Sequence, residues 1–260
     1  MSKIGPRQFT TPNTTQFQFT IMEKELTIVI PCRNEEEYIG RLLEEISLQG
    51  VGATEIILAD ANSTYRTVEE ALSSSLQLGL KLKIAPGGLP AVGRNRGAFL
   101  AKTKYILFVD ADVTFTHKCS LLDCLDQMKE GDYDMMTTTP VHRGDTNIRA
   151  SLLFFLNKIS TRWLSRREPF AIGAFTLVKK EKFDELGGYD EEVKHTEDWL
   201  LSKKILPSKF LLITDLITQD DRRFKKFGYW RMVKLIWFNW LNRNNREYYL
   251  NDAGYWLHYS

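Results

Sequence analysis

The sequence predicts an α/β protein built on a mainly parallel sheet. In its first half, short apolar runs typical of buried strands alternate with stretches whose apolar residues have helical spacing, as in repeated strand-helix-strand units. Several runs end directly in a carboxylate, as Tyr105 to Val109 does at Asp110 and Asp112. Because ligands bind outside the carboxyl ends of parallel strands, these acids are predicted to line a crevice at the sheet edge.

Composition and charge exclude several classes of protein. The chain has 260 residues, enough for a large domain with a substantial core, and its net charge of +2 is too small to indicate nucleic acid binding. Cys32, Cys119 and Cys124 lack metal-ligand spacing and leave one thiol unpaired in any disulfide scheme, which favours a reducing compartment. With no apolar run long enough for a membrane span and no signal peptide, we expect a cytoplasmic protein, with peripheral attachment to the cytoplasmic face of a membrane as an alternative.

The first strand and helix follow an aperiodic start. Residues 1–24 show neither helical nor strand periodicity and are predicted to be a flexible tail. The strand 26–31 ends at a proline, and the helix 38–48 carries an apolar stripe that faces the core. Asn34, in the turn between them, is predicted to cap this helix, and the glutamates after it suit the positive helix end.

The second strand, 55–59, ends at another acid, Asp60. A ligand role is one explanation for this carboxylate at a strand end. An Asx turn, with Ser63 or Thr64 capping the next helix, explains it equally without a ligand.

The third strand, 81–85, leads through a proline- and glycine-rich loop into a helix that begins near Ala91. Arg94 and Arg96 lie in its first turns, where they would reinforce the attraction of a helix start for phosphate, although exposed arginines need no ligand. The first loop of the chain is not Gly-X-Gly-X-X-Gly, and no P-loop motif occurs. A dinucleotide-binding or P-loop protein therefore loses its main support.

The acids after the fourth strand have the chemistry of a metal site. Asp110 and Asp112 are separated only by Ala111. Carboxylate oxygens suit Mg²⁺ or Mn²⁺, which usually keep several waters and share a substrate's phosphates. Such pairs also occur in turns and helix caps, so this pattern alone does not establish a metal.

The second half of the chain predicts further helices and strands. Glu197 and Asp198 open one of these helices and are adequate partners for its dipole without any catalytic role. Glycine within the strand 171–178 is typical of a place where the backbone approaches a ligand closely. The expected elements are helix 117–129, strand 133–139, helix 148–164, strand 171–178, helix 179–186, helix 196–206 and strand 210–214.

Four short motifs occur in order between residues 30 and 112. They are Ile30-Pro31-Cys32-Arg33-Asn34-Glu35, Asp60-Ala61-Asn62-Ser63-Thr64, Gly93-Arg94-Asn95-Arg96-Gly97-Ala98 and Phe108-Val109-Asp110-Ala111-Asp112. Each is weak alone, but their order and spacing resemble those of the inverting family 2 glycosyltransferases. The resemblance implies the GT-A fold, a Rossmann-like and mainly parallel sheet flanked by helices.

The same resemblance implies roles for individual residues. Asp198, with Glu197 beside it, matches the family's catalytic base, and Gly-Gly-Tyr-Asp at 187–190 is the usual prelude to that pair. Asp112 matches the acid that holds the metal. The positions that match the nucleotide-sugar site are Pro31, Asn34, Glu35, Asp60, Arg94, Asp110, Ala111 and Arg222.

One motif departs from the pattern of the processive members of the family. These carry Gln-X-X-Arg-Trp after their Glu-Asp pair, whereas here Gln219 is followed by two aspartates and Arg222, with Arg223 in place of the tryptophan. The segment is more similar to that of single-transfer members, in which arginines can reach the diphosphate.

The end of the chain is basic and aromatic. From Arg222 to Arg246 it has eight basic residues and no acid, interleaved with aromatic and aliphatic side chains, which is typical of a helix in a membrane interface. Because the apolar positions do not all fit one stripe, docking on the catalytic domain or a homodimer contact are alternatives, and nucleic acid is a poorer one. The predicted division is a tail 1–24, a catalytic domain 25–221 and a C-terminal helical segment 222–260.

The expected function is inverting transfer of a sugar from a nucleotide-sugar donor to a hydroxyl of a glycan or lipid-linked acceptor. A UDP-sugar is expected from its frequency in the family; the alternatives are GDP-mannose transfer to a polyprenyl phosphate and a non-catalytic sugar-nucleotide-binding protein of the same fold. Mn²⁺ or Mg²⁺ is the expected cofactor, and His195 is either a further ligand or a surface residue. A sugar nucleotidyltransferase is disfavoured because the first strand lacks a glycine-rich basic loop after it.

Overall fold

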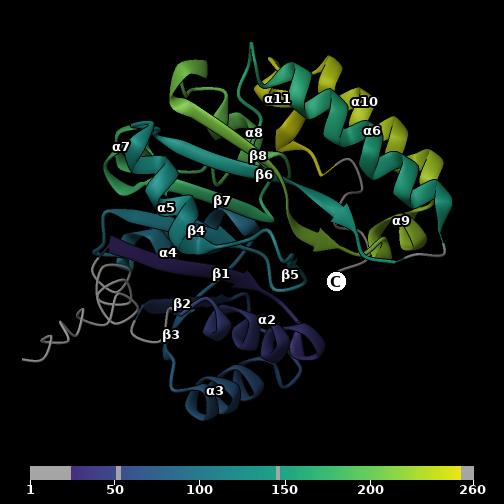
Figure 1. Ribbon diagram of the computed structural model, residues 1–260. Helices are drawn as coiled ribbons and strands as arrows, with labels where there is room; N and C mark the ends of the chain where they lie inside the picture. The colour runs from purple at the N-terminus through teal and green to yellow at the C-terminus, as the bar shows by residue number, and fades with distance from the viewer. Residues whose placement is uncertain (1–24, 51–53, 145–146, 253–260) are drawn as a thin grey trace, which may run out of the picture.

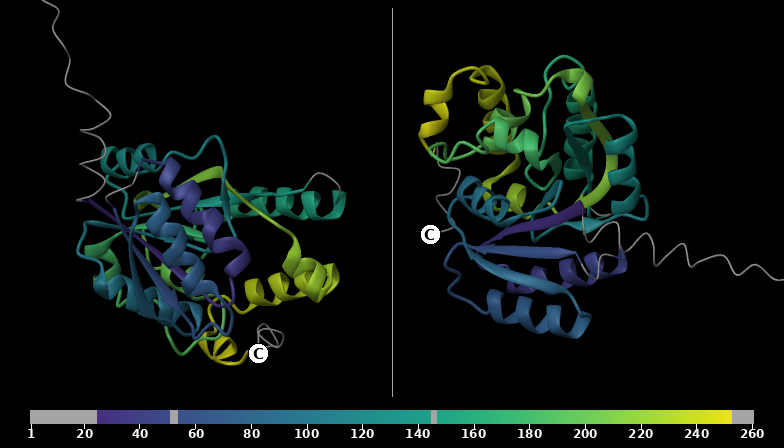
Figure 2. Two further views of the ribbon diagram at one scale, coloured as in Figure 1. Left: turned by 90° about the horizontal axis from the view of Figure 1, so that it is seen from below. Right: turned by 90° about the vertical axis from the view of Figure 1, so that its left-hand side faces the viewer.

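An eight-stranded sheet with helices on both faces forms the body of the protein (Figures 1 and 2). Its structure, a computed structural model, describes residues 25–50, 54–144 and 147–252, so the predicted tail 1–24 lies outside the described residues. The strand order is β3-β2-β1-β4-β7-β6-β8-β5. The strands are β1 (Leu26–Cys32), β2 (Glu55–Asp60), β3 (Lys81–Pro86), β4 (Tyr105–Val109), β5 (Thr114–Phe115), β6 (Met135–His142), β7 (Phe175–Lys179) and β8 (Phe210–Gln219).

The strand pairing confirms the predicted α/β class. β1 pairs in parallel with β2 and β4, and β2 pairs in parallel with β3, as the alternation of strands and helices before Asp110 predicts. Beyond β4 the sheet is mixed, because β7 runs antiparallel to both β4 and β6 while β6 and β8 are parallel. The carboxyl ends of β1, β2 and β4 therefore meet at one edge.

Two apolar layers sandwich the sheet. Alternate residues of β1 divide between them: Ile28 and Ile30 belong to the cluster that includes Ile39 of α2, whereas Val29 belongs to the cluster that includes Ala91 and Ala98 of α4. The helices are α2 (Glu36–Leu48), α3 (Thr67–Leu78), α4 (Pro90–Leu100), α5 (Leu121–Glu130), α6 (Ile148–Leu164), α7 (Lys180–Glu185), α8 (Glu197–Ser202), α9 (Arg222–Phe227), α10 (Tyr229–Leu241) and α11 (Arg246–Leu250), with a 3₁₀ turn at Pro207–Lys209.

Several predicted boundaries differ from the observed ones. The helix expected from 117 begins at Leu121, because the Ser120 side chain accepts a hydrogen bond from the Asp123 backbone N–H at 3.2 Å and caps it there. The helix expected through 206 ends at Ser202, and the strand expected to end at 214 continues to Gln219 alongside β6.

The basic C-terminal segment is broken into short helices. Gly228, with a φ of 84°, separates α9 from α10, which explains why the apolar positions of the segment do not fit one stripe. Among the described residues, no helix has both the length and the apolar character needed to cross a membrane.

Candidate active site

The Asp60 side chain holds the loop that follows β2 in place. Ser63 donates to Asp60 through its backbone N–H at 3.1 Å and its hydroxyl at 2.5 Å, so the Asp60 side chain closes the turn that follows β2. The prediction that Ser63 or Thr64 caps the next helix was wrong: Arg66 is the N-cap residue of α3, and no side chain caps that end. The Cys32 thiol lies 3.6 Å from Asp60 Oδ1 as a donor, and burial together with this acid raises the pKa of Cys32. The carboxylate at the end of β2 is therefore held in one orientation at the edge of the sheet.

Asn34 links the first loop to the second instead of capping α2. Its φ is 56°, in the left-handed region that asparagine tolerates, and its Oδ1 accepts from the Thr64 N–H at 2.9 Å. The Asn34 N–H donates in turn to Ser63 Oγ at 3.0 Å. The prediction of a helix cap was wrong: Glu35 is the N-cap residue of α2, and no side chain caps that end.

Gly87 brings the third loop against the second. Its N–H donates to the Asp60 carbonyl at 2.6 Å, and a Cβ at this position would lie 2.5 Å from the Asp60 carbonyl carbon. Only glycine permits this approach. Pro31 is paired in register with Ala59 in the neighbouring strand, so the predicted donor-site residues of β1 and β2 are adjacent.

Arg94 is a buried bridge between two acids. Its side chain is 3% exposed; Nη2 lies 2.8 Å from Asp110 Oδ1, and Nη1 bonds to Glu197. The Tyr189 ring packs beside the guanidinium at 5.6 Å. Arg94 thus ties the end of β4 to the start of α8, and its described partners are protein carboxylates.

Asp198 is held by backbone donors beside that bridge. Its Oδ2 accepts from the Gly173 N–H at 2.6 Å, and its Oδ1 accepts from the Trp199 N–H at 2.8 Å. Burial, followed by the neighbouring Glu197 charge, raises the pKa of Asp198 to about 7, while Arg94 and the backbone donors act in the opposite direction. A carboxylate with such a pKa can take up a proton near neutral pH.

Arg222 reaches back from α9 to the first half of the chain. Its Nη2 lies 2.8 Å from Asp112 Oδ2 and 3.0 Å from Glu35 Oε1, and its guanidinium stacks over the Tyr38 ring at 4.6 Å. Burial raises the pKa of Glu35 to about 7, although Arg222 lowers it in part and Asp112 adds to the rise. Two acids and one arginine thus converge from three separate segments.

A divalent cation fits the chemistry of Asp112 better than that of His195. Asp112 offers carboxylate oxygens and shares Arg222 with Glu35, so it already binds a cationic group. Mg²⁺ is often held by one or two carboxylates together with substrate phosphates. In the described part of the chain, no three histidine, cysteine or acidic side chains form a ready metal cluster. His195 is 1% exposed, against Tyr248 and Tyr249, so the surface alternative for it was wrong.

The predicted acids of the site form two groups, each joined by one arginine. Arg94 joins Asp110 to Glu197, the chain neighbour of Asp198, and Arg222 joins Asp112 to Glu35. The buried Ala111 separates Asp110 from Asp112 in the chain. The open groove between α4 and α7, lined by side chains such as Phe99 and Phe183, includes none of these acids. It is therefore separate from the candidate site.

Sequence reasoning missed four residues that shape the site. Gly173 carries the N–H that holds Asp198, and a Cβ there would lie 2.5 Å from Arg94 Nη2. The small residues of that segment predicted a close backbone approach, and the approach is to protein side chains. Tyr189 lies in the Gly-Gly-Tyr-Asp motif, which did not indicate its contact with Arg94. Tyr38 and Gly87 carried no comparable signal, because their partners lie in segments distant in sequence.

Comparison with known proteins identifies the family. The profile of "Glycosyl transferase family 2" matches residues 27–187. The 4,4'-diaponeurosporenoate glycosyltransferase of Staphylococcus aureus is 31% identical over 182 residues, which are 66% of this chain and 48% of that protein. The chain thus spans about half the length of the curated relatives it matches.

Solved structures share the fold at lower identity. A mannosyltransferase from Pyrobaculum calidifontis, in complex with GDP-Man and Mn²⁺, has a TM-score of 0.60 at 19% identity, covering 74% of this chain and 55% of that one. S. aureus TarS with UDP-GlcNAc has a TM-score of 0.59 at 19% identity, covering 76% and 59%. The glucosyl-3-phosphoglycerate synthase of Mycobacterium tuberculosis, with Mn²⁺, UDP-Glc and phosphoglyceric acid, has 0.56 at 16%, covering 85% and 81%. With the strand order and the acid cluster described above, these similarities show that the chain belongs to glycosyl transferase family 2 and has the GT-A fold.

Proposed function

We propose that the protein transfers a sugar from a nucleotide-sugar donor to a hydroxyl of a glycan or lipid-linked acceptor, with inversion at the anomeric carbon. The observation that carries this proposal is the junction of Asp198 with Asp110 through Glu197 and Arg94. It joins a candidate base in the second half of the chain to the acids at the edge of the parallel sheet. A single base without a nucleophile corresponds to one displacement, which inverts the configuration.

The donor is held by the loops that follow β1 and β2. Asp60 is oriented to accept a hydrogen bond from the nucleotide base, with Pro31 and Asn34 shaping the pocket around it. UDP-sugars are the proposed donors, supported by two structural neighbours that were crystallised with UDP-sugars. GDP-mannose is the second candidate, because a neighbour of equal similarity was crystallised with GDP-Man.

The leaving diphosphate is proposed to lie between Asp112 and Arg222. Arg222 has the planar fork that suits phosphate, and it is 33% exposed, so it can turn from the acids to an incoming diphosphate. A divalent cation, Mn²⁺ or Mg²⁺, held by Asp112 beside Asp110 would supply the charge that stabilises the departing phosphate oxygens. Arg223, which replaces the tryptophan of processive members, supports a single transfer in place of processive synthesis.

Asp198 is proposed to remove the proton from the acceptor hydroxyl. Its N–H donors from Gly173 and Trp199 fix the carboxylate, and its raised pKa makes it a more effective base than an exposed aspartate. Glu197 does not compete for this role, because it is bonded to Arg94. Its role is to hold the positive group that keeps the two halves of the site together.

Replacement of Asp198 by Asn tests the proposal. Asn keeps the shape and can accept from Gly173, but it removes the base, so transfer should fall by about 10² to 10⁴-fold. Donor binding, measured as ligand-dependent thermal stabilisation with a panel of UDP- and GDP-sugars in the presence of Mn²⁺, should be unchanged. Asp184→Asn, an exposed acid of α7, is the matched control and should keep full activity.

The possible results separate the alternatives. Retained turnover in Asp198→Asn would overturn the assignment of the base. Donor binding by the unaltered protein with no transfer to any glycan or polyprenyl phosphate acceptor would instead favour the non-catalytic sugar-nucleotide-binding protein. Stabilisation by GDP-mannose alone would make the second candidate donor the correct one.

A further inference from the structure

The outward side of α6 carries a stripe of large apolar residues, which an ordinary surface helix would turn towards the core. The side facing the protein is mixed: Ala150 and Thr161 are buried, and Lys158 bonds to Asp215 at 2.5 Å. The outward stripe recurs at spacings of three and four residues, and its members are between 51% and 82% exposed. They are Ile148, Leu152, Phe155, Ile159 and Trp163.

α10 also exposes large apolar side chains. Its inner side packs on the protein through the buried Met232 and through Asn239, which donates to Thr196 Oγ1 at 3.3 Å and accepts from Tyr249 at 2.7 Å. Its outer side is between 50% and 82% exposed at five apolar positions. They are Trp230, Ile236, Trp237, Phe238 and Leu241.

The starts of α6 and α10 are linked through Asp221. The Asn147 side chain, which caps α6, donates to Asp221 Oδ2 at 2.7 Å, and the Tyr229 hydroxyl at the start of α10 donates to the same oxygen at 2.8 Å. Phe154 of α6 contacts Phe224 of α9, with ring centroids 5.9 Å apart. Both helices lie on the same side of the molecule; they overlap in Figure 1 and lie apart in the left view of Figure 2. We call these exposed apolar side chains of the two helices the α6–α10 surface.

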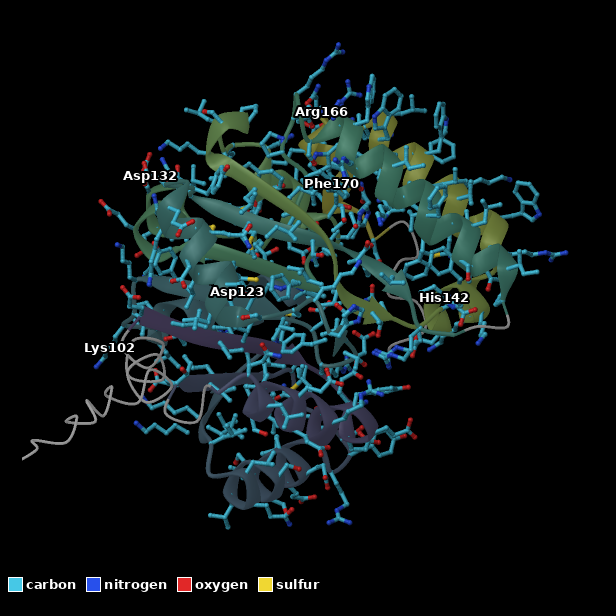
Figure 3. The ribbon with its side chains drawn as sticks, in the orientation of Figure 1. Lys102, Asp123, Asp132, His142, Arg166 and Phe170 are labelled. Atoms are coloured by element: carbon cyan, nitrogen blue, oxygen red, sulfur yellow. The ribbon has the colours of Figure 1, made fainter. Side chains whose placement is uncertain are left out.

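The helices of this surface carry an excess of basic residues. Residues 147–167 include five basic residues and no acid, and residues 222–246 include eight and no acid. Acids of other segments pair with Lys158, Arg222, Lys225, Arg243 and Arg246, and the exposed basic residues of α6 and its end include Arg149, Arg162 and Arg166. Figure 3 shows Arg166 just beyond the end of α6. A second copy of the chain would bring these basic residues against their own copies, whereas an anionic surface complements them.

We propose that the α6–α10 surface docks on an anionic lipid bilayer. The exposed indole, phenyl and aliphatic side chains lie at the level of the lipid headgroups and upper acyl chains, and exposed basic residues such as Arg149, Arg162 and Arg166 face the anionic headgroups. Given the proposed transferase function, docking places the site at the lipid surface, because Arg222 opens α9 and Asn239 contacts Thr196, the residue before Glu197. The acceptor class that fits is then one anchored in the bilayer.

Vesicle cosedimentation of the full chain tests the proposal. Phosphatidylcholine vesicles containing about one third phosphatidylglycerol should bind the protein, with affinity that falls as salt is raised, and pure phosphatidylcholine should bind it at least about tenfold less. Phe155→Ser with Trp163→Ser on α6, and Trp230→Ser with Phe238→Ser on α10, should each lower binding at least about tenfold. Phe99→Ser, which removes a phenyl group that is 86% exposed on α4, is the matched control and should bind as the unaltered protein does.

The assay needs no donor or acceptor, so its result is independent of the proposed transfer reaction. Circular dichroism melts establish that the paired variants fold. Equal binding by those variants and the unaltered protein, or no binding to the anionic vesicles, would overturn the proposal. A dimer in sedimentation that the same substitutions dissociate, without vesicle binding, would assign the surface to a second copy of the chain.

Discussion

The first half of the chain, residues 25–115, and the second half, residues 116–252, are organised differently. In the first half the loops fasten one another with bonds between side chains and backbone, such as Asp60 with Ser63 and Asn34 with Thr64. In the second half Glu197, the neighbour of the candidate base, bonds to Arg94, 103 residues earlier, and two helices expose large apolar side chains. The loops proposed to hold the nucleotide base thus lie within one segment, whereas the diphosphate and the acceptor hydroxyl need side chains from the second half, Arg222 and Asp198.

Each half contributes one arginine that bonds to acids of the other half. Arg94 extends from α4 to Glu197, and Arg222 extends from α9 to Asp112 and Glu35. Arg94 is buried and Arg222 is partly exposed. We therefore expect Arg94 to contribute mainly to stability and Arg222 mainly to donor affinity. The following variants test whether this contrast is real.

Arg94→Met should have the largest effect on stability. It leaves Glu197 and Asp110 without their cation, and removing one partner of a buried ion pair typically costs about 3 to 5 kcal/mol of unfolding free energy; the partial exposure of Asp110 favours the lower end. Chemical denaturation measures it. Arg96→Met, two residues along the same helix, is the control, because Arg96 is exposed and bonds only to the Gly87 carbonyl in the described contacts. Equal losses of unfolding free energy in Arg94→Met and Arg96→Met would show that the buried ion pairs of Arg94 have no special role in stability.

Gly173→Ala should impair catalysis more than donor binding. The new Cβ would meet Arg94 Nη2 at 2.5 Å and push aside the N–H that positions Asp198. A displacement of about 1 Å near the reacting groups commonly costs about 10²-fold in rate. Gly93→Ala is the control, since its nearest contact would be an ordinary 3.4 Å to Ala59. A lower kcat with unchanged donor KM is the expected result, and a change in KM alone would contradict it.

Sequence patterns predicted the first half more completely than the second. The motifs around Asp60 and Asp110 predicted the right edge of the sheet because strand ends and turn residues are local signals. The prediction that Asn34 caps the helix was wrong because the N–H of Thr64, 30 positions away, donates to the Asn34 side chain instead. The buried state of Arg94 was not predictable either, since a short stretch of helix does not show that an acid 103 residues later will meet it.

The pH dependence of transfer should separate activity from stability. Transfer by a base requires the ionised carboxylate, so kcat should rise about tenfold per pH unit below about 7 and level off above it, as burial and Glu197 raise the pKa of Asp198. The folded-state pKa lies above the usual 3.8, so protonation stabilises the folded protein; this contribution is present below pH 3.8 and is lost as the pH rises through about 7. Opposite trends in kcat and thermal midpoint are therefore expected across this range. A kcat that is flat between pH 5 and 8 would argue against Asp198 as the base.

Arg222→Ala should have the smallest of these effects on stability, because its side chain is 33% exposed whereas that of Arg94 is 3% exposed. Its proposed contact with the diphosphate predicts a rise of about tenfold in donor KM. Arg222→Lys should recover only part of this loss, because lysine lacks the planar fork. Full recovery of the donor KM in Arg222→Lys would show that only the positive charge of Arg222 contributes to donor binding.

The three native thiols are all buried and free, and burial raises the pKa of Cys32. Thiols that are protonated and enclosed react slowly with maleimide dyes. A cysteine introduced at the exposed Trp237 would therefore label selectively without first removing the native ones. An environment-sensitive fluorophore there would show directly, by the colour of its emission, whether α10 enters lipid or stays in water.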